Sequence, residues 1–187
     1  MNPLRLVLQV CLVLVSLAAP PLAKADSWRY PPTVESETIS HGNVRIVLTT
    51  DARLNQKYPD FVLEVFNGDK HVARIPGVSF DRLFPSPDNT LFVGLSNSGL
   101  PGTAAIVFTD QGRVTLLAQH GLAEFEYCSK SVTLNRVWFD AERPDVRFRL
   151  GANETKAGIF LRDCKGQDIE LVETVQSAYA KARKSAR

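Results

Sequence analysis

The feature that most restricts how this 187-residue chain can fold is a hairpin signal in its first half. Apolar residues alternate along residues 61–66, the chain then reads Asn67-Gly68, and a second alternating run continues to Ile75. An Asn-Gly pair between alternating runs is typical of a type I′ turn, because both turn residues need positive φ. The sequence therefore predicts two antiparallel strands that need further strands to cover their apolar side.

Short apolar runs recur along the rest of the chain, with turn residues between them. The runs predicted as strands lie at residues 44–50, 91–95, 104–109, 113–118, 132–139, 146–150, 157–162 and 168–172. Runs of this length between turn signals indicate an all-β domain. Residues 26–42 contain Pro31-Pro32, which cannot join a sheet interior, and are predicted as an irregular lead-in. The segment from Thr174 is compatible with a short C-terminal helix or with a frayed tail.

Two stretches of the chain resemble each other and a known architecture. Residues 84–95 read Phe-Pro-Ser-Pro-Asp-Asn-Thr-Leu-Phe-Val-Gly-Leu, and residues 105–112 read Ala-Ile-Val-Phe-Thr-Asp-Gln-Gly. This pattern resembles a blade of a β-propeller, with Asn89 in place of the usual glycine, and residues 144–169 resemble it more weakly. Two units cannot close a ring that needs about 4–8 blades. The resemblance therefore implies two packed, blade-like antiparallel sheets, an incomplete propeller.

The N-terminal segment has the organisation of a secretory signal peptide. Arg5 precedes an apolar run over residues 6–19, Pro20-Pro21 follows, and Ala23-Lys24-Ala25 is a small-x-small cleavage site. As a helix the run spans about 21 Å, short of the roughly 30 Å of a bilayer core. We expect a cleaved leader at 1–25, a domain at 26–173, a basic tail at 174–187 and no membrane span; a retained signal anchor is the alternative.

Cleavage would leave two cysteines, because Cys11 lies in the leader. An even pair in an exported chain favours a disulfide between Cys128 and Cys164, because the destination is oxidising. The Ala-Lys-Ala site is typical of a bacterial Sec substrate and so of a periplasmic protein, and a secreted eukaryotic origin is the alternative. The bond would close a loop worth about 3.5–4 kcal/mol in a chain-entropy description. A redox-active pair is the alternative, although such pairs usually have Cys-x-x-Cys spacing.

The charge pattern argues against a nucleic-acid partner. Without Arg5 and Lys24, the 22 basic residues of the chain become 20, which equals the number of acidic residues. The tail holds four of these bases and no acid, so residues 26–173 carry 16 bases and 20 acids. A nucleic-acid binder would cluster its bases on the folded body.

The histidines do not indicate a metal or cofactor site. His41 and His120 each precede a glycine, and a two-residue turn would place His71 opposite Glu64. None of the three has a second histidine or a carboxylate at ligand spacing. We expect no metal and no cofactor.

The sequence contains two types of candidate catalytic group. Gly94-Leu-Ser-Asn-Ser98 begins like a nucleophile elbow but lacks its second glycine, so no serine nucleophile is expected. The pairs Glu124 with Glu126 and Asp140 with Glu142 could support glycoside hydrolysis if burial set their pKa values. Without a sign of burial, a solvated face is favoured and we expect no enzyme.

The segment at residues 96–102 is the best candidate for a binding site. It has two glycines, one proline, no charge and one large apolar side chain, and it connects two strong strands. Binding residues concentrate in such connections, and the alternative is an ordinary loop. The candidate partner-binding residues are Ser96, Asn97, Ser98, Gly99 and Leu100.

Exported proteins of this size with blade-like sheets and one disulfide are similar to periplasmic immunity proteins, which block peptidoglycan-degrading effectors of the type VI secretion system. The resemblance implies a protein partner: the chain would inhibit a cell-wall hydrolase. One alternative is an exported glycan-active enzyme that uses a carboxylate pair. Another is an envelope adaptor whose basic tail meets an anionic lipid or polymer.

Overall fold

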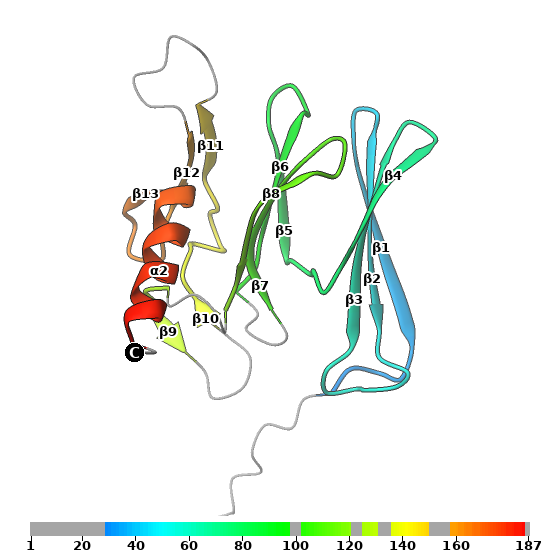
Figure 1. The fold of residues 1–187 in the computed structure, drawn as a ribbon, viewed down its shortest axis with the longest axis horizontal. Coiled ribbons are helices and arrows are strands. Elements are labelled where there is room, and N and C mark those ends of the chain that lie inside the picture. Colours follow the sequence, from blue (N-terminus) through cyan, green and yellow to red (C-terminus); the bar gives the residue numbers. More distant parts are fainter. Residues whose placement is uncertain (1–28, 98–101, 121–124, 131–135, 150–157, 186–187) are drawn as a thin grey trace, which may run out of the picture.

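The computed structural model of the chain describes residues 29–97, 102–120, 125–130, 136–149 and 158–185 (Figure 1). The predicted leader, the tip of the 96–102 segment and Glu124 lie outside these ranges. Among the described residues, no helix has the length and apolar character needed to cross a bilayer.

Two of the sheets are four-stranded antiparallel meanders. The first has the order β1-β2-β3-β4 and the second has the order β5-β6-β7-β8. Their strands are β1 (Val34–His41), β2 (Val44–Asp51), β3 (Asp60–Asn67), β4 (Lys70–Pro76), β5 (Arg82–Pro85), β6 (Leu91–Leu95), β7 (Thr103–Thr109) and β8 (Val114–Gln119). A four-stranded meander is the topology of a propeller blade.

The C-terminal third forms a smaller layer around a helix. Its strands are β9 (Ser129–Lys130) and β10 (Arg136–Val137), which pair with each other, and β11 (Val146–Arg149), β12 (Gly158–Arg162) and β13 (Asp168–Glu170), which form a third sheet. Helix α2 (Leu171–Ser185) follows and packs against β12 and β13. Of the strand predicted at 132–139, the described part is β10 and an isolated bridge from Phe139 to Asp163.

The three layers lie beside one another, with the second sheet in the middle (Figure 1). The predicted all-β fold of antiparallel, blade-like sheets is confirmed, together with a C-terminal helix. The structure adds β1–β4 as a further sheet in front of the two units that resemble each other.

The middle sheet is buried on both faces. Every residue of β7 from Thr103 to Phe108 is buried. On one face, Phe92 and Phe108 pack with residues of β2 and β3. On the other face, Val93 and Val107 pack with Trp138, among other residues of the C-terminal layer and α2. A strand covered on both sides needs a nearly continuous apolar run, and β7 has one.

Strand β1 corrects the prediction of an irregular lead-in over residues 26–42. The segment 34–41 pairs with β2 along its whole length. Neither face of this strand carries a row of apolar side chains, and six of its eight residues are exposed. An edge strand of this kind is held by backbone hydrogen bonds to its neighbour, so it leaves little hydrophobic signal in the sequence.

The β3–β4 hairpin is present, but its turn is shifted by one residue. Asn67 pairs with Lys70, so the turn residues are Gly68 and Asp69, and Gly68 alone has positive φ. Glycine at the first central position is typical of a type II′ turn. His71 therefore lies opposite Phe66 rather than Glu64, although its Nε2 still lies 3.4 Å from the Glu64 carboxylate.

The last predicted strand ends two residues early, because a helix begins at Leu171. The Glu170 carboxylate accepts a hydrogen bond from the backbone N–H of Glu173, at 2.6 Å, and so caps the first turn. Leu171, Val175 and Ala178 lie on one side of α2 and are buried in the core. The helix thus covers the core on the C-terminal side.

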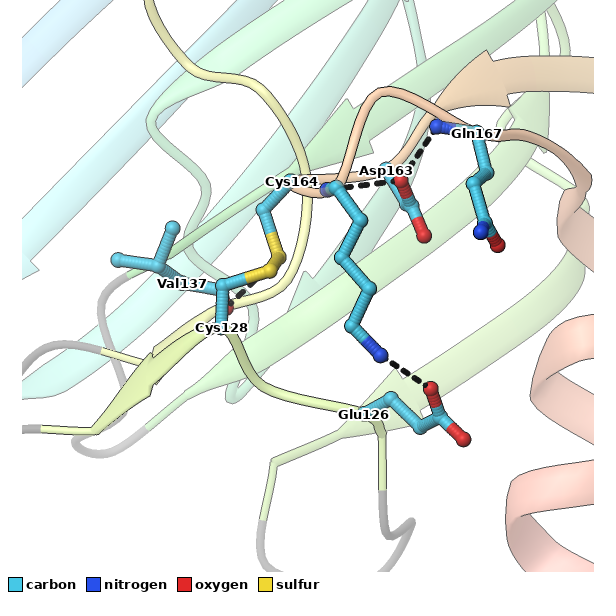
Figure 2. Close-up of polar contacts among 7 residues, drawn as sticks. Glu126, Cys128, Val137, Asp163, Cys164 and Gln167 are labelled. Atoms are coloured by element: carbon cyan, nitrogen blue, oxygen red, sulfur yellow. Dashed lines mark hydrogen bonds and ion pairs between the residues drawn. A yellow bond between two sulfur atoms is a disulfide. The ribbon is translucent and has the colours of Figure 1, made fainter.

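The predicted disulfide is confirmed. Cys128 and Cys164 are bonded, with their Cα atoms 6.0 Å apart. The bond ties the chain before β9 to the turn between β12 and β13 (Figure 2). In that turn, the Asp163 carboxylate accepts backbone hydrogen bonds from Lys165 and Gln167.

Candidate functional site at the base of the β6–β7 loop

The segment singled out by the sequence connects β6 to β7. The structure describes its two ends, Ser96 and Asn97 on one side and Gly102 on the other. Ser98, Gly99 and Leu100 lie outside the described residues. The site can therefore be built from the base of the loop upward.

Ser96 is buried and makes hydrogen bonds to several segments that are distant in the sequence. Its hydroxyl donates to the Asp81 carboxylate at 2.8 Å. Its backbone N–H donates to the carbonyl of Ala104, at 3.0 Å, which joins the two ends of the loop. Its carbonyl accepts a 2.8 Å hydrogen bond from the indole Nε1 of Trp138 in the C-terminal layer.

Asn97 connects the second sheet to the C-terminal layer. Its backbone N–H donates to Asp81 at 3.0 Å, and its carbonyl accepts from the N–H of Arg136 at 2.7 Å. Its side-chain oxygen accepts from the backbone N–H of Trp138 at 3.2 Å. Both main-chain and side-chain groups of Asn97 are therefore engaged inside the protein.

His120 closes the other end of the loop. Its backbone N–H donates to the Gly102 carbonyl at 3.0 Å. Its Nε2 lies 3.1 Å from the Ser96 carbonyl, and its Nδ1 lies 3.2 Å from the Tyr127 hydroxyl. Because a carbonyl only accepts, Nε2 carries the proton. The Tyr127 hydroxyl also lies 3.4 Å from the His120 carbonyl, so its single proton is shared between that oxygen and Nδ1.

The His120 ring is neutral in this setting. Burial lowers the pKa of His120 below its ordinary value, against the opposing effect of the hydrogen bond to the Ser96 carbonyl. The ring is enclosed by aromatic side chains, with Phe125 and Tyr127 at centroid distances of 6.2 and 5.9 Å. A neutral histidine satisfies both of its ring nitrogens here without placing a charge in the core.

Serine, histidine and aspartate meet at this point, but they are not arranged for nucleophilic catalysis. The Ser96 hydroxyl is hydrogen-bonded to Asp81, whereas His120 contacts the Ser96 carbonyl and not its hydroxyl. A catalytic triad needs the histidine as the base for the hydroxyl proton. The three residues instead hold the backbone at the start of the loop.

The hydrogen bonds of Ser96 and Asn97 hold the base of the loop. Direct contact between a partner and Ser96, Asn97, Ser98, Gly99 or Leu100 remains a prediction. The long-range cluster of Asp81, His120 and Trp138 was missed, because no short spacing in the sequence marks residues that meet only in the folded chain.

Two of the carboxylates that could support glycan chemistry, those of Glu126 and Asp140, are engaged in structural contacts. Glu126 accepts a 2.8 Å hydrogen bond from the Lys165 ammonium group, which lowers the pKa of Glu126 (Figure 2). The Asp140 carboxylate accepts the backbone N–H groups of Glu142 and Arg143. A general acid in glycoside hydrolysis needs a raised pKa, so Glu126 is not prepared for that role.

Within the described ranges, no three metal-ligating side chains come together. No family model, curated protein or solved structure matches this chain. The feature of this chain that best supports a function is therefore the 96–102 loop and the hydrogen bonds at its base.

Proposed function

We propose that this protein is an exported inhibitor of a cell-wall hydrolase, of the immunity-protein type, and that it inserts the 96–102 loop into the enzyme's cleft. The observation that carries the proposal is the anchoring of this loop. The Ser96–Ala104 backbone bond joins its two ends, and the N–H of His120 holds Gly102. Ser96 is also fixed to Asp81 and Trp138.

Anchoring favours a binding role because a loop whose two ends are already fixed has less conformational entropy to lose when a partner binds. The loop also starts and ends on the middle sheet, which is packed on both faces and therefore resists deformation. Inhibitors of hydrolases typically bind with little change in the backbone of the interface.

The composition of the loop suits a closed cleft. It carries no charge, so its insertion would not bury an unpaired ion, which is costly. Leu100 is its one large apolar side chain and would be the anchor that fills a pocket of the enzyme. The bonded pair Cys128–Cys164 supports export to an oxidising compartment.

The test compares two variants that add the same charge to opposite ends of β7. Ser98→Lys changes the proposed contact loop, and Gln111→Lys changes the exposed turn between β7 and β8. Titration calorimetry against purified peptidoglycan amidases, endopeptidases and glycosidases should find a partner. For it, Ser98→Lys should weaken binding by about 1.4 kcal/mol or more, a factor of ten, because it forces a charge into a closed site.

Gln111→Lys should leave the affinity unchanged, and both variants should melt within a few degrees of the wild type, since surface changes usually cost under about 0.5 kcal/mol. Equal affinity of the Ser98→Lys and Gln111→Lys proteins would remove the loop from the mechanism. Failure of the wild type to bind any of these hydrolases would refute the inhibitor proposal itself.

A further inference from the structure

Strand β1 forms an open edge of the first sheet. It pairs with β2 alone, residue for residue, over all eight positions and without a bulge. The other edge of this sheet, β4, has a register shift beside Phe66 and ends at Pro76. Bulges, prolines, covering segments and charged side chains normally protect edge strands from pairing with another chain. In the described part of the chain, β1 has only the charges of Glu35 and Glu37, which disfavour an acidic partner but not a basic one.

The direction of the backbone groups of β1 follows from its hairpin. The turn closes at the His41–Val44 pair, and the N–H of Ala52 donates to the carbonyl of Thr33. Hydrogen-bonded pairs alternate along an antiparallel ladder, so the odd-numbered residues bond to β2. The N–H and C=O groups of Ser36, Thr38 and Ser40 therefore point away from β2, where no described strand lies.

A hollow of about 240 Å³ lies along the inner side of this edge. Its apolar lining comes from Leu48, Phe61, Val78 and Phe80. Glu35 and Glu37 also line it; they are exposed and lie opposite Thr50 and Leu48, so they share this side of the sheet. An apolar lining beside carboxylates suits a side chain with an aliphatic stem and a cationic head.

We propose that the β1 edge is a second binding site, which takes an extended segment of a partner protein with lysine or arginine at alternate positions. The segment would add a strand beside β1, with hydrogen bonds to Ser36, Thr38 and Ser40. Its residues opposite Glu35 and Glu37 would point to the same side of the sheet, over the hollow. The site does not depend on the proposed hydrolase inhibition.

A second copy of this chain fits the edge less well than a basic partner. Strand β1 reads Val-Glu-Ser-Glu-Thr-Ile-Ser-His and contains no lysine or arginine. Two paired β1 strands would therefore bring together four glutamates with no cation of that kind between them. Like charges across strands destabilise pairing, whereas opposite charges favour it.

The experiment uses the protein recovered from expression of the whole chain. The probe is a fluorescent, blocked peptide that alternates lysine with valine, and its binding is followed by anisotropy. A peptide that alternates glutamate with valine is the control for charge. The wild type should bind the basic peptide at least about tenfold more tightly than the acidic one, because charge pairs of both signs contribute.

Two substitutions at one position separate strand addition from simple charge attraction. Thr38→Pro removes an N–H that points away from β2, a change that edge strands tolerate. Thr38→Val keeps the N–H and favours a strand. Thr38→Pro should weaken binding of the basic peptide about tenfold, through a lost hydrogen bond and the bulk of the ring, and Thr38→Val should bind like the wild type.

The double variant Glu35→Gln, Glu37→Gln tests the carboxylates and should weaken binding roughly two- to tenfold at low salt. If Thr38→Pro fails to fold, this variant and the backbone amide shifts of β1 in NMR spectra decide instead. The proposal is overturned if Thr38→Pro binds like the wild type, if the two peptides bind equally, or if millimolar basic peptide does not bind. If the protein instead forms a dimer that Thr38→Pro disrupts and that the basic peptide does not disrupt, the edge binds a second copy of this chain.

Discussion

At the scale of single residues, His120 holds together segments of the fold that are distant in the sequence. Its backbone holds Gly102, its Nε2 donates to Ser96 and its Nδ1 accepts from Tyr127. Each of these groups would be costly to bury without a partner. Protonation of the ring would leave Nδ1 hydrogen-bonded, because the Tyr127 hydroxyl can also accept and can donate to the His120 carbonyl. It would, however, add a charge to the core.

This arrangement predicts a pH dependence of stability. Because the folded pKa of His120 is lowered, the unfolded chain takes up a proton below about pH 6.5 that the folded chain does not. The free energy of unfolding should therefore be highest above that pH and should fall as the pH decreases below it. Urea unfolding at about pH 7.5 and 5.5 measures the difference, at pH values above those at which the carboxylates titrate.

His120→Gln should flatten this dependence, since glutamine keeps an Nε2 donor but does not titrate. His71→Gln is the matched control, because His71 is exposed and lies beside Glu64 on the first sheet. An equal loss of stability at low pH in the His120→Gln protein and in the wild type would show that another group is responsible.

At the scale of the elements, the turn between β7 and β8 fixes how the first two sheets approach each other. Gly112 in this turn has a φ of +70°, and a Cβ at this position would overlap the Cβ of Ala73 in β4. Gly166 in the β12–β13 turn has a similar φ of +80°, but a Cβ there meets nothing within 4 Å. Both glycines have the positive φ that other residues rarely adopt, but only Gly112 has a neighbour that a Cβ would overlap.

Alanine at these two positions should therefore have unequal effects. Gly166→Ala should cost about 1 kcal/mol, the strain of a left-handed backbone. Gly112→Ala should cost a further 1–3 kcal/mol or so, because β4 must move away from the new methyl group. Chemical unfolding of both variants measures the difference. Equal destabilisation would mean that the two sheets do not pack closely at this turn.

Most strands could be predicted from the sequence, because alternation and turn residues act locally. Asn89 illustrates this: it stands where a blade usually has glycine, and it adopts that conformation, with a φ of +55°. Strand β1 could not be predicted, since an exposed edge strand has no apolar face. The predicted turn at Asn67-Gly68 was wrong by one residue. Gly68-Asp69 can equally form a two-residue turn between the same two apolar runs, so the sequence does not distinguish the two positions.

The candidate loop could be predicted from composition, but its anchoring could not. Ser96 and His120 are 24 residues apart in the sequence, and Ser96 and Trp138 are 42 apart. Ser96 meets His120 only when β6, β7 and β8 pair, and it meets Trp138 only when the second sheet stacks against the C-terminal layer; no local pattern specifies either contact. The same stacking explains why β7 is buried on both sides while its neighbour β8 exposes Leu117.

At the scale of the whole molecule, three β layers and one helix form an open stack rather than a ring (Figure 1). The core lies on the two faces of the middle sheet, against the first sheet on one side and the C-terminal layer on the other. The disulfide joins two segments within the C-terminal layer. This architecture leaves the β6–β7 loop and the β1 edge at different places on the protein, the first for the proposed hydrolase and the second for a basic extended segment.

We expect this protein to act by binding a cell-wall hydrolase and not by cleaving glycans. A direct assay measures the release of reducing ends and of peptide fragments from peptidoglycan, by the protein alone and by purified hydrolases with increasing amounts of it. The protein alone should release neither, and it should inhibit at least one hydrolase stoichiometrically. Release of reducing ends by the protein alone, abolished by Glu126→Gln, would contradict this expectation and establish the carboxylate enzyme instead.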